Sequence, residues 1–375
     1  MAPTASPGSV QVARILGIPV FVHFSWFVIF GLIAWTLATG YFPERYPNLP
    51  VTSYWAKGLL ASLLFFVSIL LHELGHSVVA LKSGLAIRSI TLFIFGGVAR
   101  LEKDPPDGRT ELRMAAAGPA VSLVLAGLFL AAGSLAPPGG TPWAVARYLS
   151  VINLVVAAFN LVPAFPLDGG RLLRGLLWKS MGKARSTRVA ARAGTLFAYF
   201  LIASGVVSML RGSGISGMWY VLIGWFLKDA SVGAYQSARV DEALRGVTAA
   251  DAMVKDPATL PAEISLAEAV HEHFLRTGYG AYPVVRGDAP VGLLCRRDVL
   301  KVPPEDRERT SVQAAMTPLA ELAVVPPAAP LIRAMSRMAE SGVGRVLVMD
   351  GGRLAGLLTM GSVLRHVRVR DELGE

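Results

Sequence analysis

Two histidines and a glutamate are the residues whose types and spacing point most directly to chemistry. His72, Glu73 and His76 form an HExxH pattern within one apolar stretch. On a helix, residues four apart lie on the same face. Two imidazoles so placed can bind one Zn²⁺, and the glutamate can act as general base toward a zinc-bound water. The pattern therefore predicts a metal site with His72 and His76 as ligands and Glu73 as the catalytic base.

The surroundings of this pattern decide between a metal site and two surface histidines, which is the usual origin of a chance HExxH in soluble helices. The motif lies in an apolar run over residues 55–81, and a bilayer span needs about 20 apolar residues. Lipid offers no solvated face, and ionisable side chains inside a membrane are costly and usually functional. Metal binding is therefore the favoured interpretation.

Composition indicates a membrane protein. Of the 375 residues 53% are hydrophobic and only 17% charged, whereas soluble proteins carry about 25% charged residues. Residues 1–239 carry 20 Lys and Arg against 8 Asp and Glu, a net charge of +12, and residues 240–375 carry 16 against 18, a net charge of −2. The basic excess thus lies between apolar segments, as the positive-inside rule predicts, and nucleic acid is excluded as a partner.

The N-terminal residues and the single cysteine set further limits. Residues 1–10 are rich in Ala, Pro, Ser and Gly and are expected to form a disordered tail. The apolar run from about Ile15 exceeds a signal-peptide core and lacks a convincing cleavage site, so we expect a retained first span. Cys295 is the one cysteine of the chain, so no intrachain disulfide can form.

The apolar segments predict about six transmembrane helices, the last of them short. They cover residues 20–38, 55–81, 114–135, 143–162, 193–210 and 215–227. The basic segment 179–192 is expected to be a cytoplasmic loop. The loops after spans two and four hold 6 and 7 Lys and Arg, against 2, 1 and 1 in the alternate loops. Both termini are therefore predicted to be cytoplasmic, in a bacterial- or archaeal-type plasma membrane.

Asp168 is predicted to reach the same membrane depth as the two histidines, because spans two and four both end on the cytoplasmic side. It follows a segment from Asn160 that contains two prolines and precedes two glycines, which predicts an ordered non-helical turn. His23 admits two interpretations. An interfacial histidine beside an aromatic belt is favoured over a side chain that faces the site from the neighbouring helix.

A β-hairpin is predicted between spans two and three. Residues 87–95 and 98–101 are rich in β-branched and aromatic side chains and flank Gly96-Gly97. An open sheet edge cannot face lipid. The hairpin must therefore be covered by protein, lie at the interface, or receive another strand.

The C-terminal part contains a repeat with a period of about 64 residues. Met253 recurs as Met316 and Gly278 as Gly342. Each unit, about 245–302 and 308–370, is expected to contain a helix, two strands joined by a glycine turn, and a closing helix. Such a duplication predicts a paired soluble α/β module.

On these motifs the first part of the chain resembles the site-2 proteases, intramembrane zinc metalloproteases, and the repeat resembles a tandem pair of CBS domains. The resemblance covers about residues 10–235 and 240–375. It rests on HExxH, on Phe95-Gly96-Gly97, on Gly118-Pro119, and on the segment from Asn160 to Asp168-Gly169.

The resemblance implies a polytopic α-helical membrane protein with a membrane-associated β-hairpin, residues 1–239, followed by a cytoplasmic CBS pair, residues 240–375. It implies one Zn²⁺ per chain, with Asp168 as third ligand beside His72 and His76. Asn160 and the hairpin residues Phe95, Gly96 and Gly97 would position the substrate, a single-pass membrane protein cleaved in regulated intramembrane proteolysis. The CBS pair would regulate the enzyme or form a homodimer.

Two other classes remain open at this point. A transporter or channel with a regulatory CBS pair would explain six spans and intramembrane charges, but not an HExxH with a distant aspartate at equal depth. A metal-free scaffold descended from a protease would retain the motifs without activity. Bound zinc separates the protease from the transporter, and cleavage separates the protease from the scaffold.

Nucleotide-binding CBS domains resemble this pair only in part. They typically place Thr or Ser three residues before an Asp near the ribose. The first repeat keeps Asp298 but has Cys295 in place of the hydroxyl, and the second keeps Thr359 but has Ser362 in place of the carboxylate. A pair that only packs and dimerises is favoured over one retained adenine-nucleotide site at Asp298, so nucleotide binding is expected to be weak or absent.

Overall fold

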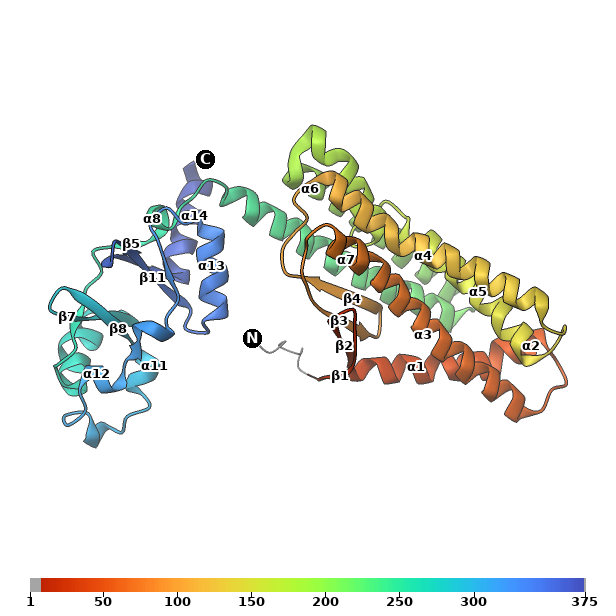
Figure 1. The fold of residues 1–375 in the computed structure, drawn as a ribbon, viewed down its shortest axis with the longest axis horizontal. Helices are drawn as coiled ribbons and strands as arrows, with labels where there is room; N and C mark the ends of the chain where they lie inside the picture. The colour runs from red at the N-terminus through yellow and green to blue at the C-terminus, as the bar shows by residue number, and fades with distance from the viewer. Residues whose placement is uncertain (1–7, 374–375) are drawn as a thin grey trace. The chain divides into compact units, whose positions relative to one another are not determined.

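The structure is a computed structural model that describes residues 8–373. The chain divides into two compact units, Met1–Ala238 and Arg239–Glu375. The first unit contains long helices and one small sheet, and the second contains two sheets with short helices (Figure 1). The boundary falls inside helix α7, Gly214–Ala243.

Five helical segments of the described chain are long and apolar enough to cross a membrane, which identifies a membrane protein. The first, Phe24–Arg45, joins α1 (Phe24–Thr36), the π-helical turn η1 (Leu37–Tyr41) and α2 (Phe42–Arg45). The others are α3 (Val51–Lys82), α4 (Gly108–Leu135), α5 (Thr141–Asn160) and α6 (Asp168–Leu210). Helix α7 is not among them, because its apolar stretch before Lys228 is shorter than the about 20 residues of a span. The sixth span therefore stays a prediction.

The expected first span starts too early, because residues before Phe24 form strands. Strand β1 (Ser9–Ile15) pairs antiparallel with β2 (Ile18–His23) around Leu16 and Gly17, which both have positive φ. Two positive φ angles define the tight turn that suits a hairpin. The expectation of a disordered tail is wrong for Ser9 and Val10, which lie in β1, and its residues 1–7 lie outside the described chain.

The sheet of the first unit has the order β1-β2-β3-β4. Strand β3 (Ile87–Phe93) pairs parallel with β2 and antiparallel with β4 (Gly96–Leu101). Phe93 pairs with Gly96, so the turn is Ile94-Phe95, and Gly96-Gly97 lie in β4 rather than in the turn as expected. Strand β2 thus covers one side of the predicted hairpin, and β4 is an edge of the sheet.

The basic segment 179–192 is helical, so the prediction of a loop there is wrong. It lies within α6, where only Gly182 departs from helical geometry, with φ 76° and ψ 164°. Lys and Arg have good helix propensity, which explains why this segment continues as helix on either side of the glycine. Glycine tolerates this positive φ because it has no Cβ.

The segment between α5 and α6, residues 161–167, is non-helical as expected and folds tightly onto the start of α6. A Cβ on Gly169 would lie 2.2 Å from the Val162 carbonyl oxygen, and one on Gly170 would lie 2.3 Å from the Phe165 nitrogen. Both glycines are therefore required by close backbone approach. This approach places Asp168 at the first residue of α6.

The second unit contains two four-stranded sheets with the orders β6-β7-β8-β9 and β10-β11-β12-β5. In each, a long antiparallel pair forms the centre. The strands are β5 (Val254–Lys255), β6 (Leu260–Pro261), β7 (Ala281–Arg286), β8 (Ala289–Cys295), β9 (Thr317–Pro318), β10 (Val324–Val325), β11 (Arg345–Asp350) and β12 (Arg353–Thr359). The helical segments are α8 (Ala249–Ala252), α9 (Leu266–Glu268), η2 (Ala269–Phe274), α10 (Leu275–Thr277), α11 (Arg296–Val299), η3 (Pro304–Asp306), α12 (Val312–Ala315), η4 (Leu319–Glu321), α13 (Leu331–Glu340) and α14 (Met360–Leu373).

The two repeats exchange their first strands. Strand β5 of the first repeat pairs with β12 of the second, and β9 of the second pairs with β8 of the first. The repeated methionines and glycines mark this exchange. A Cβ on Gly356 would lie 2.5 Å from the Met253 sulfur, and one on Gly292 would lie 2.6 Å from the Met316 sulfur. Each methionine thus packs on a glycine of the other repeat.

Candidate metal and catalytic site

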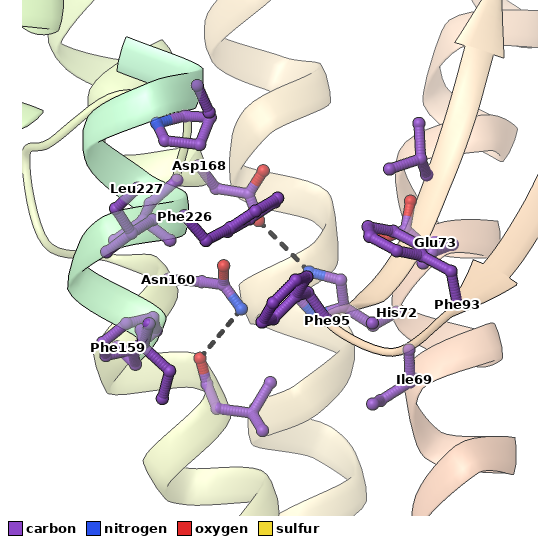
Figure 2. A pocket seen from close by; sticks show the side chains of 18 of the residues that line it. Ile69, His72, Glu73, Phe93, Phe95, Phe159, Asn160, Asp168, Phe226 and Leu227 are labelled. Atoms are coloured by element: carbon purple, nitrogen blue, oxygen red, sulfur yellow. Dashed lines mark hydrogen bonds and ion pairs between the residues drawn. The ribbon is translucent and has the colours of Figure 1, made fainter. Parts of the chain in front are cut away.

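The structure brings His72 and His76 of α3 together with Asp168 of α6. The Oδ2 atom of Asp168 lies 3.1 Å from the Nε2 atom of each histidine, and the two Nε2 atoms lie 3.2 Å apart. All three side chains are buried. Figure 2 shows Asp168 directed toward His72 across the site. Three potential ligand atoms therefore converge on one point.

The hydrogen bond at Nδ1 of His76 determines whether its Nε2 atom, which faces Asp168, can donate or accept. The Nδ1 atom of His76 lies 2.7 Å from the carbonyl oxygen of Met114, which can only accept, so Nδ1 carries the hydrogen. In the neutral ring, Nε2 then presents a lone pair to the carboxylate oxygen of Asp168. Two acceptors in contact require a proton or a cation between them. The Nδ1 atom of His72 lies 2.8 Å from Ser122 Oγ, a hydroxyl that can donate or accept.

The donor set fits zinc. Catalytic zinc sites use three protein ligands, nitrogen and carboxylate oxygen among them, and keep one position open. Hydrogen bonds from the second ring nitrogen orient such histidines. Gly118 of α4 supplies the space, because a Cβ there would lie 2.2 Å from His76 Nε2 and 2.5 Å from His72 Nε2. Residues His72, His76 and Asp168 form the buried group of the described chain that can hold a metal ion.

Glu73 is outside this ligand group but lines the same cavity. The cavity has a volume of about 1110 Å³, and the metal group, Glu73 and β4 all contribute to its wall. A Cβ on Gly97 would lie 2.5 Å from Glu73 Cγ, so β4 approaches the glutamate closely. Elsewhere the wall is mainly aliphatic and aromatic, as Figure 2 illustrates with Ile69, Phe159 and Leu227.

The predicted substrate-positioning residues also line this cavity. Asn160, at the end of α5, donates from Nδ2 to the Val156 carbonyl at 3.1 Å. Phe95, Gly96 and Gly97 come from the turn and first residues of β4. The Phe95 ring stacks on Phe226 of α7, with ring centroids 4.2 Å apart and an interplanar angle of 17°.

His23 lies outside the residues that form the cavity wall. Its Nδ1 atom accepts from the backbone nitrogen of Ser25 and lies 2.8 Å from Ser25 Oγ, so it caps the N-terminus of α1. Ser25 Oγ in turn accepts from the Ile94 nitrogen at 3.2 Å. His23 therefore caps α1, and Ser25 connects α1 to the β3–β4 turn.

Several residues that support the site could not be recognised from spacing. Ser122 and the Met114 carbonyl hold the histidines from α4. Glu111, fully buried on α4, accepts from Arg171 Nε at 3.0 Å and from Arg174 Nη2 at 2.6 Å. Arg171 follows Asp168 by less than one helical turn and lines the cavity. Glu111 thus anchors the start of α6.

The two CBS positions singled out by the sequence lie at helix starts. Asp298 is buried; its Oδ2 atom accepts from the Cys295 nitrogen at 3.1 Å and its Oδ1 atom from Lys301 Nζ at 2.9 Å. Thr359 Oγ1 accepts from the Ser362 nitrogen at 3.1 Å. Burial raises the pKa of the Cys295 thiol, which is therefore neutral near pH 7.

Comparisons with known proteins agree with these features. The profile of "Peptidase family M50" matches residues 60–138 and 139–204, and that of the CBS domain matches residues 249–305 and 312–369. The chain is 36% identical over 367 residues to a Mycobacterium tuberculosis protein named "Putative zinc metalloprotease Rip3", covering 96% of this chain and 93% of that one. It is 31% identical over 369 residues to the zinc metalloprotease MJ0392 of Methanocaldococcus jannaschii, covering 97% of each.

Among solved structures, the site-2 protease from Methanocaldococcus jannaschii shares 32% sequence identity with this chain. The match covers 60% of this chain and 95% of that one, with a TM-score of 0.45. The site and the relatives together define a membrane zinc metalloprotease. The chain belongs to peptidase family M50, the site-2 proteases, and carries a C-terminal pair of CBS domains.

Proposed function

We propose that this protein hydrolyses peptide bonds within or next to transmembrane segments of single-pass membrane proteins, in regulated intramembrane proteolysis. The observation that carries the proposal is that His72, His76, Asp168, Glu73 and the edge strand β4 line one largely apolar cavity. An apolar wall suits a membrane-embedded substrate. The polar side chains His72, Glu73, His76 and Asp168 would face the peptide bond that is hydrolysed.

One Zn²⁺ per chain is proposed at the converging atoms of His72, His76 and Asp168. When bound, zinc would polarise the scissile carbonyl and make water more acidic. Glu73 accepts a proton from the attacking water, whose oxygen bonds to the carbonyl carbon. Glu73 then donates that proton to the amine nitrogen as the carbon–nitrogen bond breaks. The buried histidines keep their geometry through their hydrogen bonds with Ser122 and the Met114 carbonyl of α4.

The substrate is proposed to bind as an extended strand on β4. A helical peptide has its backbone groups paired, so the scissile segment must unwind before attack. An edge strand can accept an extended peptide through main-chain hydrogen bonds. The close approach of Gly97 to Glu73 supports this arrangement, because a peptide on β4 would pass beside the base. Phe95 and Gly96 would contact the same segment.

Asn160 is proposed to bind the substrate carbonyl or its developing negative charge. One of its amide hydrogens goes to Val156. An amide nitrogen carries two hydrogens, so the second can donate to a substrate oxygen.

A cleavage assay in lipid vesicles tests the proposal, with a panel of single-pass membrane proteins as substrates. Cleavage that needs both zinc and Glu73 would support the protease. A fully folded chain that neither binds zinc nor cleaves any panel member would favour the metal-free scaffold. A transporter would move solutes without cleaving the panel.

Both termini are proposed to be cytoplasmic, with α7 crossing the membrane. A reporter fused to the C-terminus is therefore expected to be active only on the cytoplasmic side. One inserted after Gly139, between α4 and α5, should be active only outside, because the basic segments lie elsewhere, before α4 and within α6. An external C-terminus together with an external Gly139 would show that α7 does not cross, and that the number of spans is odd.

The CBS pair is proposed to act as a regulatory or dimerisation module with weak or no affinity for adenine nucleotides. Both carboxylate oxygens of Asp298 already accept hydrogen bonds, from the Cys295 nitrogen and from Lys301 Nζ, which supports this. Calorimetry of residues 240–375 with ATP and AMP should give little heat. Any binding should be lost in Asp298→Ala and retained in the control Ser362→Ala. Tight binding that survives Asp298→Ala would contradict the prediction.

A further inference from the structure

The segment that precedes Asp168 is fixed at one residue, Phe165, through both of its backbone polar groups. Its nitrogen donates to the Ala190 carbonyl at 3.1 Å, and its carbonyl oxygen accepts from Ser231 Oγ at 2.6 Å. Ala190 belongs to the second half of α6, and Ser231 belongs to α7. Two helices thus hold the backbone three residues before Asp168.

The hydrogen bond from Ser231 to the Phe165 carbonyl lies in the protein interior. Ser231 is fully buried, and its hydroxyl crosses from α7 to a loop 66 residues earlier in the chain. Gly194 allows the approach, because a Cβ there would lie 2.0 Å from the Phe165 carbonyl oxygen and 2.5 Å from Ser231 Oγ. A carbonyl in the interior that loses its donor is destabilising, so the contact holds the loop.

A short, tight path leads from Phe165 to Asp168. The Leu167 nitrogen donates to the Ala164 carbonyl at 2.9 Å, and the Gly170 nitrogen donates to the Leu167 carbonyl at 3.0 Å. A Cβ on Gly170 would lie 2.3 Å from the Phe165 nitrogen, so the Phe165 backbone touches the first turn of α6. A displacement of the Phe165 backbone would therefore displace the first turn of α6.

The start of α6 has no side-chain cap, since Leu167 occupies the N-cap position. Glu111 holds α6 after Asp168, through Arg171 and Arg174. The loop bonds described above hold the chain before Asp168. The carboxylate is thus fixed from both sides, and Ser231 provides the hydroxyl on the loop side.

We propose that Ser231 is a positioning residue for the third metal ligand. Its hydroxyl fixes the Phe165 carbonyl, and through that peptide it sets the place of the Asp168 carboxylate relative to His72 and His76. The inference rests on the proposed function in taking Asp168 as a zinc ligand. It adds that α7, which contributes no ligand atom, determines how tightly zinc is held.

The test uses the full-length chain and compares Ser231→Ala with Ser186→Ala. Ser186 is a matched control, because it is also fully buried but bonds only within α6, to the carbonyls of Gly182 and Lys183. Zinc affinity is measured by chelator competition, ligand geometry by the absorption bands of the Co²⁺-loaded protein, and stability by thermal unfolding of the apoprotein. Asp168→Ala is measured alongside.

Ser231→Ala is expected to weaken zinc binding about tenfold, the lower end of the range for residues that support metal ligands, and to shift the Co²⁺ bands. Ser186→Ala should leave both as in the native chain. Ser231→Thr, which keeps the hydroxyl, should bind zinc within about twofold of the native chain. If Ser231→Ala does not fold, Ser231→Cys, a weak donor of similar size, is measured instead, with the same direction expected.

Native zinc affinity and native Co²⁺ bands in a folded Ser231→Ala or Ser231→Cys chain would overturn the inference. So would a Ser231→Thr chain that binds zinc as weakly as Ser231→Ala. Native zinc affinity in Asp168→Ala has a different meaning, because it would remove Asp168 from the ligand set and so overturn the proposed metal site itself.

Discussion

Replacing Glu73 by glutamine is expected to abolish cleavage while zinc stays bound. The amide has nearly the same shape as the carboxylate but cannot accept a proton from water. Positioned acid–base groups contribute about 10²–10⁴-fold to a rate, and Glu73 is proposed to act in both proton transfers, so a loss near the top of this range is expected. The metal group does not include Glu73 and should be undisturbed.

The measurement combines a cleavage time course with metal analysis of the same preparation. Glu44→Gln is the matched control, because Glu44 is an exposed carboxylate on α2 and does not contribute to the cavity wall. It should cleave at the native rate. Native turnover by Glu73→Gln would show that another group is the base, and loss of its zinc would show that Glu73 holds the metal.

Removing any one of the three converging side chains is expected to strip the metal. In His72→Ala, His76→Ala and Asp168→Ala only two of the three ligand atoms remain. Two protein ligands bind zinc much more weakly than three. Each purified variant should retain only a small fraction of its zinc after dialysis against a mild chelator, and each should lose cleavage.

His23→Ala provides the control for histidine removal. Its side chain caps α1 and lies outside the cavity wall, so the variant should keep a full complement of zinc. Full zinc occupancy in Asp168→Ala would take Asp168 out of the ligand set. Zinc loss in His23→Ala would restore the interpretation in which this histidine faces the site.

The elements that carry the chemistry were predictable because their signals are local. A long apolar run around HExxH defines α3, and prolines with glycines define the turn before Asp168. Strand β2 was instead predicted as the start of the first span, and the reason is also local. Its residues Ile18 to Val22 are all buried, so it reads as a continuous apolar run that cannot be told from a helix.

The glycines of the hairpin show how a correct pattern can be assigned the wrong place. Gly96-Gly97 between two β-rich runs predicts a turn, yet the turn is Ile94-Phe95. Gly97 meets a different need, because any side chain there would collide with Glu73. Sequence alone does not separate a glycine that bends the chain from one that leaves room for another side chain.

The hydrogen bonds that hold the site residues could not be predicted from the sequence, because the bonded residues are distant in the chain. Ser122 lies 50 residues from His72, Arg171 lies 60 from Glu111, and Ser231 lies 66 from Phe165. None of these pairs has a characteristic spacing. Only the packing of α3, α4, α6 and α7 brings them together.

The exchanged strands of the CBS pair have a consequence for how this part of the chain folds. Neither repeat can complete its sheet alone, because β5 pairs with β12 and β9 pairs with β8. About a hundred residues separate β5 from β12. A pairing as distant in sequence as that of β5 with β12 forms late in folding and slows it. The two repeats should therefore gain and lose structure together, in one cooperative transition, and a ribosome that stalls between them would leave the first repeat with an unpaired edge.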